Sequence, residues 1–476
     1  MPNRPYIFYE LTNSICSKCL RKVEAKIIFE QGNVYLLKHC MKHGREKVLI
    51  STDIEYYKKC REFLKPSEMP HRFNTPIQYG CPYDCGLCPD HEQHSCLTLV
   101  EITDQCNLTC PICYAESSPH KQTYRSLETI EKMLDAIVKN EKEADIVQIS
   151  GGEPTIHPQF FDILDLAKHK PIKHIMVNTN GIKIAQDKKF VEKLATYMPG
   201  FEIYLQFDSF QEHALKELRG LDLRHIREKA IEHLNEFNIS TTLVVTLKKG
   251  LNDHEIGDII EYGLKQKAVR GVTFQPIQAA GRLEDYDPAV NRLTLSEVRQ
   301  KIIEQSKVFT EKDIIPVPCH PDCLAMGYAL KMNGNVIPLT GMIDPNILLE
   351  GGRNTIVFEQ DEHLKDQVFE LFSLNQTPQS SAIQLKDLLC CLPKVVPTGN
   401  IGYENVFRVI IMQFLDAYHF DVRSVKKSCV HIAHSDGRII PFDTYNLFYR
   451  DDREKVLTEI RREMEGAVSE SVRTKS

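Results

Sequence analysis

Cysteine is distributed very unevenly along this chain, and this restricts its fold more than any other feature. Of the 16 cysteines, eleven lie between Cys16 and Cys113, none lies between residues 114 and 318, and five lie from Cys319 to Cys429. At about 3% of the residues they are too few for a small secreted disulfide scaffold. The first residues, MPNRPYIFYE, contain no apolar segment typical of a secretion signal. We therefore expect a cytoplasmic protein whose clustered thiols bind metal.

Length and charge exclude several classes of protein. A chain of 476 residues corresponds to roughly three domains. Its formal net charge of -6 gives no basic excess of the kind that phosphate binding requires, so we expect no nucleic-acid partner. No stretch approaches about 18 uninterrupted apolar residues, so we expect no membrane-spanning helix.

Short apolar runs alternate with amphipathic helical patterns over residues 98–316. The predicted strands are LTLVEI, IVQIS, HIMVNT, FEIYLQFD, STTLVVT and VTFQPI, with helices between them. This alternation is typical of parallel βα units and predicts an α/β fold, either a (β/α)6 barrel or a doubly wound sheet. We place the other segment boundaries at 1–70, 71–97 and 317–476, and expect the last segment to end in a charged helix, DREKVLTEIRREMEG.

The sharpest motif is the loop Cys106-Asn-Leu-Thr-Cys110-Pro-Ile-Cys113, which follows the first predicted strand. Three thiolates on one short loop can bind three irons of a [4Fe-4S] cluster, whereas full ligation takes four. The fourth iron then stays open to a ligand that chelates through an amine and a carboxylate. A structural zinc site or a ferredoxin-type site is the alternative for this loop on its own.

The motif Gly151-Gly152-Glu153-Pro154 follows the second predicted strand. Together with the cysteine loop, it resembles the radical S-adenosylmethionine (radical SAM) superfamily. The resemblance implies a partial (β/α)6 TIM-type barrel and a catalytic cluster on Cys106, Cys110 and Cys113. It also implies reductive cleavage of S-adenosylmethionine (SAM) to a 5'-deoxyadenosyl radical, with a low-potential electron donor of the ferredoxin or flavodoxin type.

The same resemblance assigns residues to the binding of SAM. The glycine motif would bind the methionyl amine, because glycines let backbone carbonyls approach a small ligand closely. Asn178 and Asn180, at the end of the third strand, would bond the ribose. For both motifs the alternative is an ordinary turn.

Two charged residues complete the expected SAM site. Asp208 is two residues after Gln206, and on one strand the two side chains would point to the same side, toward cofactor or substrate. Arg219, followed by Gly220, resembles the superfamily's basic contact to the cofactor carboxylate. A surface arginine before a helix is the alternative.

A second C-x3-C-x2-C loop, formed by Cys81, Cys85 and Cys88, lies just upstream, and Cys96 follows it. Four thiolates suffice to ligate a [4Fe-4S] cluster completely. We expect an auxiliary cluster here, because no glycine motif follows directly. A zinc ribbon is the alternative.

The N-terminal region carries two further metal-binding pairs. Cys16 and Cys19 form the first pair, and Cys40 and His43 form the second. A β-like stretch with a hairpin signal at Gln31-Gly32-Asn33 separates them. This pattern predicts a four-coordinate Cys3His site for a mononuclear zinc or iron.

Five cysteines remain in the last segment. We expect Cys319, Cys323 and Cys429, with one of the adjacent Cys390 and Cys391, to bind a second auxiliary [4Fe-4S] cluster. Buried free thiols are the alternative.

Taken together, these motifs resemble the radical SAM subgroup that contains tetraether lipid synthase and is also described as dihydropterin methyltransferase-like. That resemblance implies carbon-carbon coupling of lipid alkyl chains as the main hypothesis. The alternative is methyl transfer to a pterin or another small heterocycle, with a second SAM as methyl donor. A non-enzymatic iron-sulfur carrier would leave the glycine motif and the open-iron loop without a purpose.

Two features bear on the choice of substrate. VFRVIIMQFLDAYHF, residues 406–420, is interpreted as a helix that lines an alkyl tunnel or contacts a membrane surface, or as a buried core helix. The cavity beside Cys113 should be a long apolar tunnel for a lipid and a shorter pocket with polar groups for a pterin.

Overall fold

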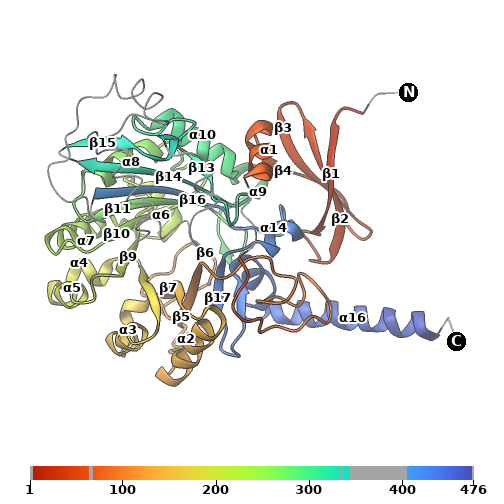
Figure 1. The fold of residues 1–476 in the computed structure, drawn as a ribbon, viewed down its shortest axis with the longest axis horizontal. Helices are drawn as coiled ribbons and strands as arrows, with labels where there is room; N and C mark the ends of the chain where they lie inside the picture. Colours follow the sequence, from red (N-terminus) through yellow and green to blue (C-terminus); the bar gives the residue numbers. More distant parts are fainter. Residues whose placement is uncertain (1–3, 64–67, 333, 343–404, 474–476) are drawn as a thin grey trace, which may run out of the picture.

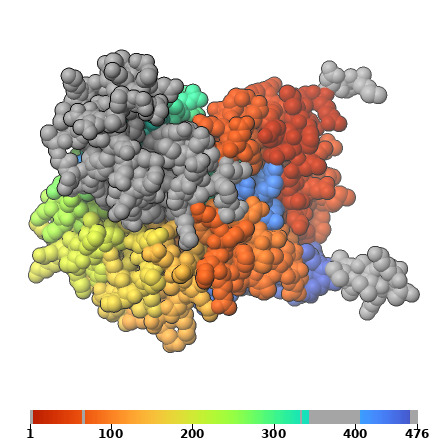
Figure 2. Space-filling view, in the orientation of Figure 1, coloured from red at the N-terminus to blue at the C-terminus, as the bar shows by residue number. Residues whose placement is uncertain are grey.

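A four-stranded antiparallel sheet forms the N-terminal part of the protein, which is described here from a computed structural model over residues 4–63, 68–332, 334–342 and 405–473. Its strands run in the order β1 (Ile7–Ile15), β2 (Lys22–Glu30), β3 (Asn33–Cys40) and β4 (Gly44–Ser51), followed by α1 (Ile54–Glu62). The hairpin predicted at Gln31-Gly32 joins β2 to β3, and Gly32 has the positive φ of 82° that this turn requires. The sheet lies beside the main body of the molecule, in red in Figures 1 and 2.

All six predicted strands are present and form the centre of a larger sheet. They are adjacent and parallel in the order β5 (Leu97–Thr103), β7 (Ala144–Gly151), β8 (Ile172–Thr179), β9 (Phe201–Gln206), β10 (Thr241–Leu247) and β11 (Val269–Pro276). The α/β prediction is therefore confirmed. The helices that connect them are α2 (Leu127–Glu141), α3 (Phe160–Lys168), α4 (Ile182–Gln186), α5 (Lys188–Ala195), α6 (Glu212–Arg219), α7 (Arg224–Glu236) and α8 (Ile256–Lys265).

The C-terminal part of the chain extends this sheet on both sides. Strand β16 (Val406–Met412) pairs in parallel with β11, and β17 (Val430–Ala433) pairs in parallel with β5. The outer strands are β13 (Ile315–Pro316), β14 (Leu324–Met332), β15 (Asn335–Pro338) and β18 (Ile439–Pro441). Over the described residues the order ends at β13 and β18, which do not pair, so this sheet is open rather than a closed barrel.

The expectation of a helix over residues 406–420 is wrong, because residues 406–412 form strand β16. Phe407, Val409 and Ile411 pack on one face of the sheet, whereas Ile410 and Met412 pack on the other. A strand buried on both faces has a continuous apolar run, which periodicity cannot distinguish from a buried helix. Residues 406–412 therefore form part of the buried sheet and not an amphipathic helix.

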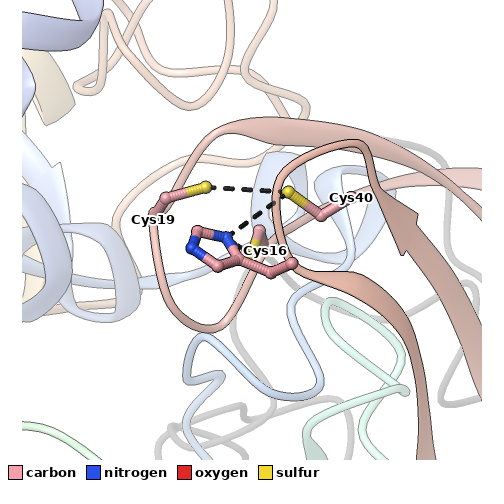
Figure 3. A group of neighbouring side chains, drawn as sticks. Cys16, Cys19 and Cys40 are labelled. Atoms are coloured by element: carbon pink, nitrogen blue, oxygen red, sulfur yellow. Dashed lines mark hydrogen bonds between the residues drawn. The ribbon is translucent and has the colours of Figure 1, made fainter.

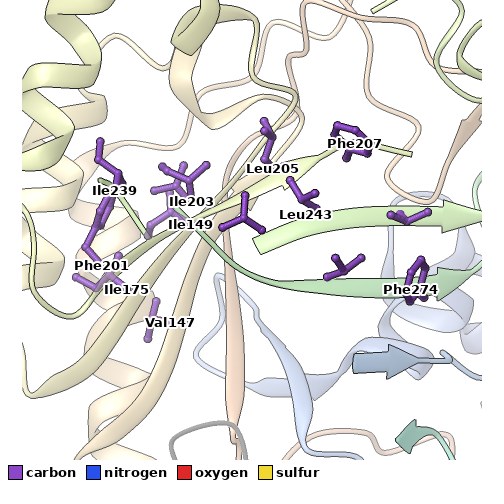
Figure 4. Close-up of a cluster of buried hydrophobic side chains, with 14 of the residues drawn as sticks. Val147, Ile149, Ile175, Phe201, Ile203, Leu205, Phe207, Ile239, Leu243 and Phe274 are labelled. Atoms are coloured by element: carbon purple, nitrogen blue, oxygen red, sulfur yellow. The ribbon is translucent and has the colours of Figure 1, made fainter. Parts of the chain in front are cut away.

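Apolar side chains cover both faces of the central sheet. Figure 4 shows Val147, Ile149, Ile175 and Ile203 gathered on one face, which packs against the helices. The alternate residue Ile146 belongs to the core on the other face. This alternation fixes the register of each strand, because a slip of one residue would exchange the two faces.

Further strands and α-helices lie outside the central βα units. They are β6 (Ile112–Cys113), β12 (Arg282–Leu283), α9 (Pro288–Asn291), α10 (Leu295–Gln305), α14 (Val422–Lys426) and α15 (Phe442–Thr444). The predicted charged helix is α16 (Arg453–Arg473), which projects from the body in Figure 1. Among the helices that the structure describes, none is both long and apolar enough to cross a membrane.

Candidate active site

The loop with Cys106, Cys110 and Cys113 follows β5, at the edge of the sheet where the parallel strands end. Its last residues form β6, which pairs with β12 through Cys113 and Arg282. The Arg282 guanidinium also donates to the carbonyls of Cys110, at 2.6 Å, and Ser117, at 2.8 Å. Burial raises the pKa of Cys106 to about 12, so a thiolate here needs a nearby positive charge such as a metal centre.

The glycine motif packs directly on the end of β5. The Gly152 amide donates to the Thr103 carbonyl at 2.7 Å, and the Glu153 amide donates to the Gln105 carbonyl at 2.9 Å. A Cβ on Gly152 would lie 2.1 Å from the Gln105 carbonyl oxygen, and one on Gly151 would lie 2.2 Å from that of Thr103. Only glycine permits this approach, which brings the motif beside the cysteine loop.

Glu153 is buried, and its carboxylate accepts hydrogen bonds from residues around the site. One carboxylate oxygen accepts from the Thr155 amide at 3.2 Å and the Thr179 hydroxyl at 2.7 Å, and the other accepts from the Asn180 amide at 2.8 Å. Burial raises the pKa of Glu153 on balance, although these hydrogen bonds oppose the rise. Its side chain therefore holds the end of β8 in place.

The two asparagines at the end of β8 line the same cavity as the cysteine loop. The Asn180 side-chain amide donates to Asn107 Oδ1 at 2.6 Å, which ties β8 to the cysteine loop. Asn178 Oδ1 is buried and has no hydrogen-bond partner within the described part of the chain. A buried acceptor without a donor is costly, and a ribose hydroxyl in this cavity would satisfy it. The residues present therefore fit SAM.

Asp208 does not lie on the strand with Gln206, contrary to the geometry expected for it. Strand β9 ends at Gln206, and Asp208 has a left-handed backbone with φ of 68°. Its fully buried carboxylate binds Arg219 through two bonds of 2.7 Å, and Thr246 lies within 2.9 Å of the same guanidinium. Gln206 and Arg219 line the cavity, whereas Asp208 positions Arg219.

These groups line one cavity, whose volume, including the part open to solvent, is about 1010 Å³. Residues of the cysteine loop and of the glycine motif line it, together with carboxamides and aromatic rings, namely Gln206, Gln275, Gln278, Phe414 and Phe442. The centres of the Phe414 and Phe442 rings lie 4.0 Å apart, and the planes of the two rings are inclined by 31° to each other.

The four predicted N-terminal ligands, Cys16, Cys19, Cys40 and His43, come together, with all four ligand atoms within 4.8 Å of one another. The Cys19 and Cys40 sulfurs are 3.8 Å apart, and His43 Nδ1 lies 3.4 Å from the Cys16 sulfur (Figure 3). A tetrahedral ion with metal-sulfur bonds of about 2.3 Å places its sulfurs about 3.8 Å apart. These residues therefore fit a single tetrahedral ion.

The second cysteine loop is held by the C-terminal region. The Tyr449 hydroxyl accepts from the Cys85 amide at 2.8 Å and donates to the Tyr83 carbonyl at 2.9 Å. The Cys85 sulfur lies 3.1 Å from the Pro82 carbonyl oxygen, and the neighbouring Cys81 thiol, together with burial, holds the pKa of Cys85 well above its usual value. The three thiols of this loop remain a proposed site for an auxiliary cluster.

Cys96 lies elsewhere, and this changes the ligand sets expected from sequence. Its sulfur groups with those of Cys319 and Cys429, all within 4.8 Å. Cys323 instead lies 3.6 Å from the Ser424 hydroxyl, outside this group. The other two predicted ligands, Cys390 and Cys391, lie outside the described residues.

Several cavity residues escaped the sequence analysis. Gln275 lies at the end of the sixth strand, β11, and Gln278 follows it, and this position at the carboxyl end of a parallel strand was the available signal. Arg227 is buried on α7, donates to the Asn180 carbonyl and lies 3.8 Å from Asp208. No motif marks it, because only the tertiary fold brings α7 to this edge.

Comparison with known proteins gives similarities along nearly the whole chain. Residues 100–263 match the Radical SAM superfamily, and residues 8–52 match the HMPTM N-terminal zinc ribbon domain. The chain is 32% identical to 7,8-dihydro-6-hydroxymethylpterin dimethyltransferase of Methanocaldococcus jannaschii, over 93% of this chain and 94% of that protein. It is 31% identical to GTP 3',8-cyclase of Alkaliphilus metalliredigens, over 43% of this chain and 62% of the cyclase. Streptococcus suis SuiB bound to S-adenosylmethionine is similar over 41% of this chain and 45% of that one, at 19% identity and a TM-score of 0.35.

Proposed function

Because the chain belongs to the radical SAM superfamily, and to the family of the Methanocaldococcus jannaschii pterin dimethyltransferase within it, we propose that it methylates a pterin. The protein is a radical SAM enzyme. Similarity over 94% of a pterin dimethyltransferase favours methyl transfer to a small heterocycle over the coupling of lipid chains.

In this proposal Cys106, Cys110 and Cys113 hold the catalytic cluster. When bound, the cluster and SAM supply a carbon-centred radical, with an electron from a low-potential donor of the ferredoxin or flavodoxin type. The carbonyls of the glycine motif bind the methionyl end of SAM, and Asn178 bonds its ribose. Arg219, held rigid by Asp208, offers its cation to the SAM carboxylate.

The carboxamides that line the cavity carry the choice of a pterin. They belong to Gln206, Gln275 and Gln278, and each carboxamide both donates and accepts hydrogen bonds. A pterin has donors and acceptors along the edge of a planar ring, so it suits these groups. Gln275 already bonds Tyr204, and Gln278 bonds Leu415 and Asn446, so an alkyl chain would leave unused only the hydrogen-bonding capacity that these contacts do not take.

Aromatic rings support the same choice. Phe442 packs against Phe414 and, at 5.0 Å between ring centres, against Tyr114. Phe414 and Phe442 line the cavity beside the carboxamides, and a planar heterocycle can stack on such faces. Gln278 is itself fixed, because it donates to the Leu415 carbonyl at 2.7 Å.

Expression in a host that lacks this chain tests the proposal. Mass spectrometry of the pterins and of the lipids from the same cells should show methylated pterins and an unchanged lipid profile. A strain that expresses the Cys106→Ala variant is the control and should match the host. Coupled lipid chains with unmodified pterins would overturn the proposal.

A further inference from the structure

The segment that follows β11 carries a carboxamide whose backbone is held firmly. Gln278 is buried and lines the active-site cavity. The Ala279 amide donates to the fully buried Asp416 carboxylate at 3.1 Å, and Arg292 donates to both oxygens of that carboxylate at 2.8 and 2.7 Å. The Ala280 amide donates to the Gln278 carbonyl at 2.8 Å. The fold therefore places Gln278 at the cavity before any molecule binds there.

A buried arginine determines which way this carboxamide points. Arg450 donates through Nε to Asn446 Oδ1 at 2.9 Å. A guanidinium has donors and no acceptor, so the oxygen of Asn446 must face Arg450 and its NH2 group must point elsewhere. That NH2 group donates to Gln278 Oε1 at 3.1 Å. The Gln278 NH2 group is thereby directed to the Leu415 carbonyl, to which it donates at 2.7 Å.

Reversal of the Gln278 carboxamide would break both of its hydrogen bonds. Its NH2 group would then face the NH2 group of Asn446, and its oxygen would face the Leu415 carbonyl oxygen. Buried polar groups that lose their partners in this way are costly. The orientation of Gln278 is therefore fixed by a series of contacts that begins at Arg450.

Arg450 is itself anchored to the first strand of the central sheet. Glu101 on β5 accepts from Arg450 Nη1 at 3.0 Å and from Nη2 at 2.7 Å, and both side chains are buried. The guanidinium carbon also lies 4.9 Å from the centre of the Tyr445 ring and 5.4 Å from that of Tyr114. Because Glu101 compensates the charge of Arg450, these contacts fix the orientation of Gln278 without adding a net charge beside the cavity.

Gln275 lines the same cavity under a weaker constraint. Its Nε2 atom donates to the Tyr204 hydroxyl at 3.2 Å and lies 3.8 Å from the Met412 sulfur, which is a weak acceptor. A hydroxyl donates as well as accepts, so the Gln275 carboxamide can reverse and keep a bond to Tyr204. Gln275 can therefore adapt to a donor or an acceptor on a bound molecule, whereas Gln278 can distinguish between them.

We propose that Gln278 determines specificity by pairing with the lactam edge of the pterin, and that Asn446 and Arg450 are positioning residues that fix its orientation. This inference rests on the proposed function. Asn446 and Leu415 each take one hydrogen-bonding position of Gln278, which leaves one N–H and one acceptor position for a substrate. A lactam has an N–H beside a carbonyl, so it can pair with both. Leu415 directly follows Phe414, whose ring lines the cavity, and a heterocycle stacked on that ring can turn its edge toward Gln278.

Two pterins that differ only along this edge test the proposal on the wild-type protein. One is 7,8-dihydro-6-hydroxymethylpterin, and the other is its 2,4-diamino analogue, which has an acceptor in place of the lactam N–H and a donor in place of the lactam carbonyl. Equilibrium dialysis measures the affinity of the anaerobically reconstituted full chain for each, with SAM and without a reductant. The lactam should bind about 10–100-fold more tightly, because the fixed carboxamide opposes the exchanged groups. Equal affinities would overturn this inference and leave the proposed function standing, whereas binding of neither compound would overturn both.

Asn446→Asp tests whether the series of contacts sets this preference. The new carboxylate keeps an acceptor for Arg450 but accepts where Asn446 donates, so the Gln278 NH2 group should turn toward it. The ratio of the two affinities should then fall by about tenfold or more. A general loss of structure would weaken the binding of both pterins alike, and such an unchanged ratio would overturn the role of Asn446.

Asn235→Asp is the matched control for this variant. Asn235, on α7, donates to the Gln266 carboxamide at 2.8 Å, and neither residue lines the cavity. The substitution removes the same kind of donor from a glutamine side chain, and the preference for the lactam should stay at its wild-type value. An equal fall of the ratio in both variants would contradict the assignment of specificity to Gln278. The wild-type comparison decides the proposal even where a variant fails to fold.

Discussion

Replacing Asp208 by Asn should destabilise the protein strongly, because it removes the negative charge from a buried cluster of guanidinium groups. Asp208 is fully buried and forms two bonds of 2.7 Å with Arg219, whose side chain is 9% exposed. Arg227, also buried, lies 3.8 Å from the same carboxylate. Breaking a buried pair in this way leaves an uncompensated charge and costs about 3–5 kcal/mol. Arg219 would also lose its fixed position in the cavity, so the affinity for SAM should fall.

The matched control is Asp222→Asn, which makes the same chemical change at the surface. Asp222 also receives two hydrogen bonds from one arginine, Arg224, at 2.9 and 2.8 Å, but the two side chains are 30% and 46% exposed. An exposed pair contributes about 1 kcal/mol or less. Urea unfolding followed by far-ultraviolet circular dichroism suits this chain, which contains no tryptophan. Equal losses of stability in the two variants would refute the reasoning.

The same comparison predicts a pH dependence. Burial raises the pKa of Asp208, but the charge and hydrogen bonds of Arg219 outweigh burial and hold that pKa below its usual value. The pair therefore contributes stability above the pKa of the unfolded carboxyl group, and this contribution is lost as the pH falls through the folded value. The difference in the free energy of unfolding between wild type and Asp208→Asn should therefore shrink in acid. A difference that grows in acid would contradict this assignment of charge to Asp208.

Three further variants probe the active site and the N-terminal metal site. Gly152→Ala should disrupt the active-site loop and abolish SAM binding, because its Cβ would lie 2.1 Å from the Gln105 carbonyl oxygen. The control is Gly466→Ala in α16, where a Cβ has open space. It should leave the stability unchanged or raise it by up to about 1 kcal/mol. Glu153→Gln turns an acceptor into a donor inside a buried network and should cost about 1–3 kcal/mol in unfolding experiments. Cys19→Ser should release the N-terminal ion without loss of iron, as measured by elemental analysis.

The central strands and the loop with Cys106, Cys110 and Cys113 were predictable because their signals are local. Six short apolar runs at regular spacing specify parallel strands, and the spacing of Cys106, Cys110 and Cys113 places three thiols on one loop. The N-terminal ligands are also separated by a simple hairpin, so their approach follows from the β2–β3 turn.

The remaining features depend on contacts between distant segments. The sequence predicts Cys96 as the fourth ligand beside Cys81, Cys85 and Cys88, since only seven residues separate it from Cys88. The parallel pairing of β17 with β5 instead brings Cys429 beside it. Strand β16 was misread for a related reason, because burial between β11 and β14 on a two-faced sheet removes the alternation that marks an exposed strand.

Product analysis with the purified enzyme tests the central claim most directly. The wild-type protein, with its clusters reconstituted anaerobically, is incubated with 7,8-dihydro-6-hydroxymethylpterin, SAM and a low-potential reductant, and the pterin is analysed by mass spectrometry. We predict a pterin that has gained one or more methyl groups, and none with the Cys106→Ala variant. Cleavage of SAM with an unmodified pterin, together with the loss of hydrogen from added lipid chains, would contradict the claim.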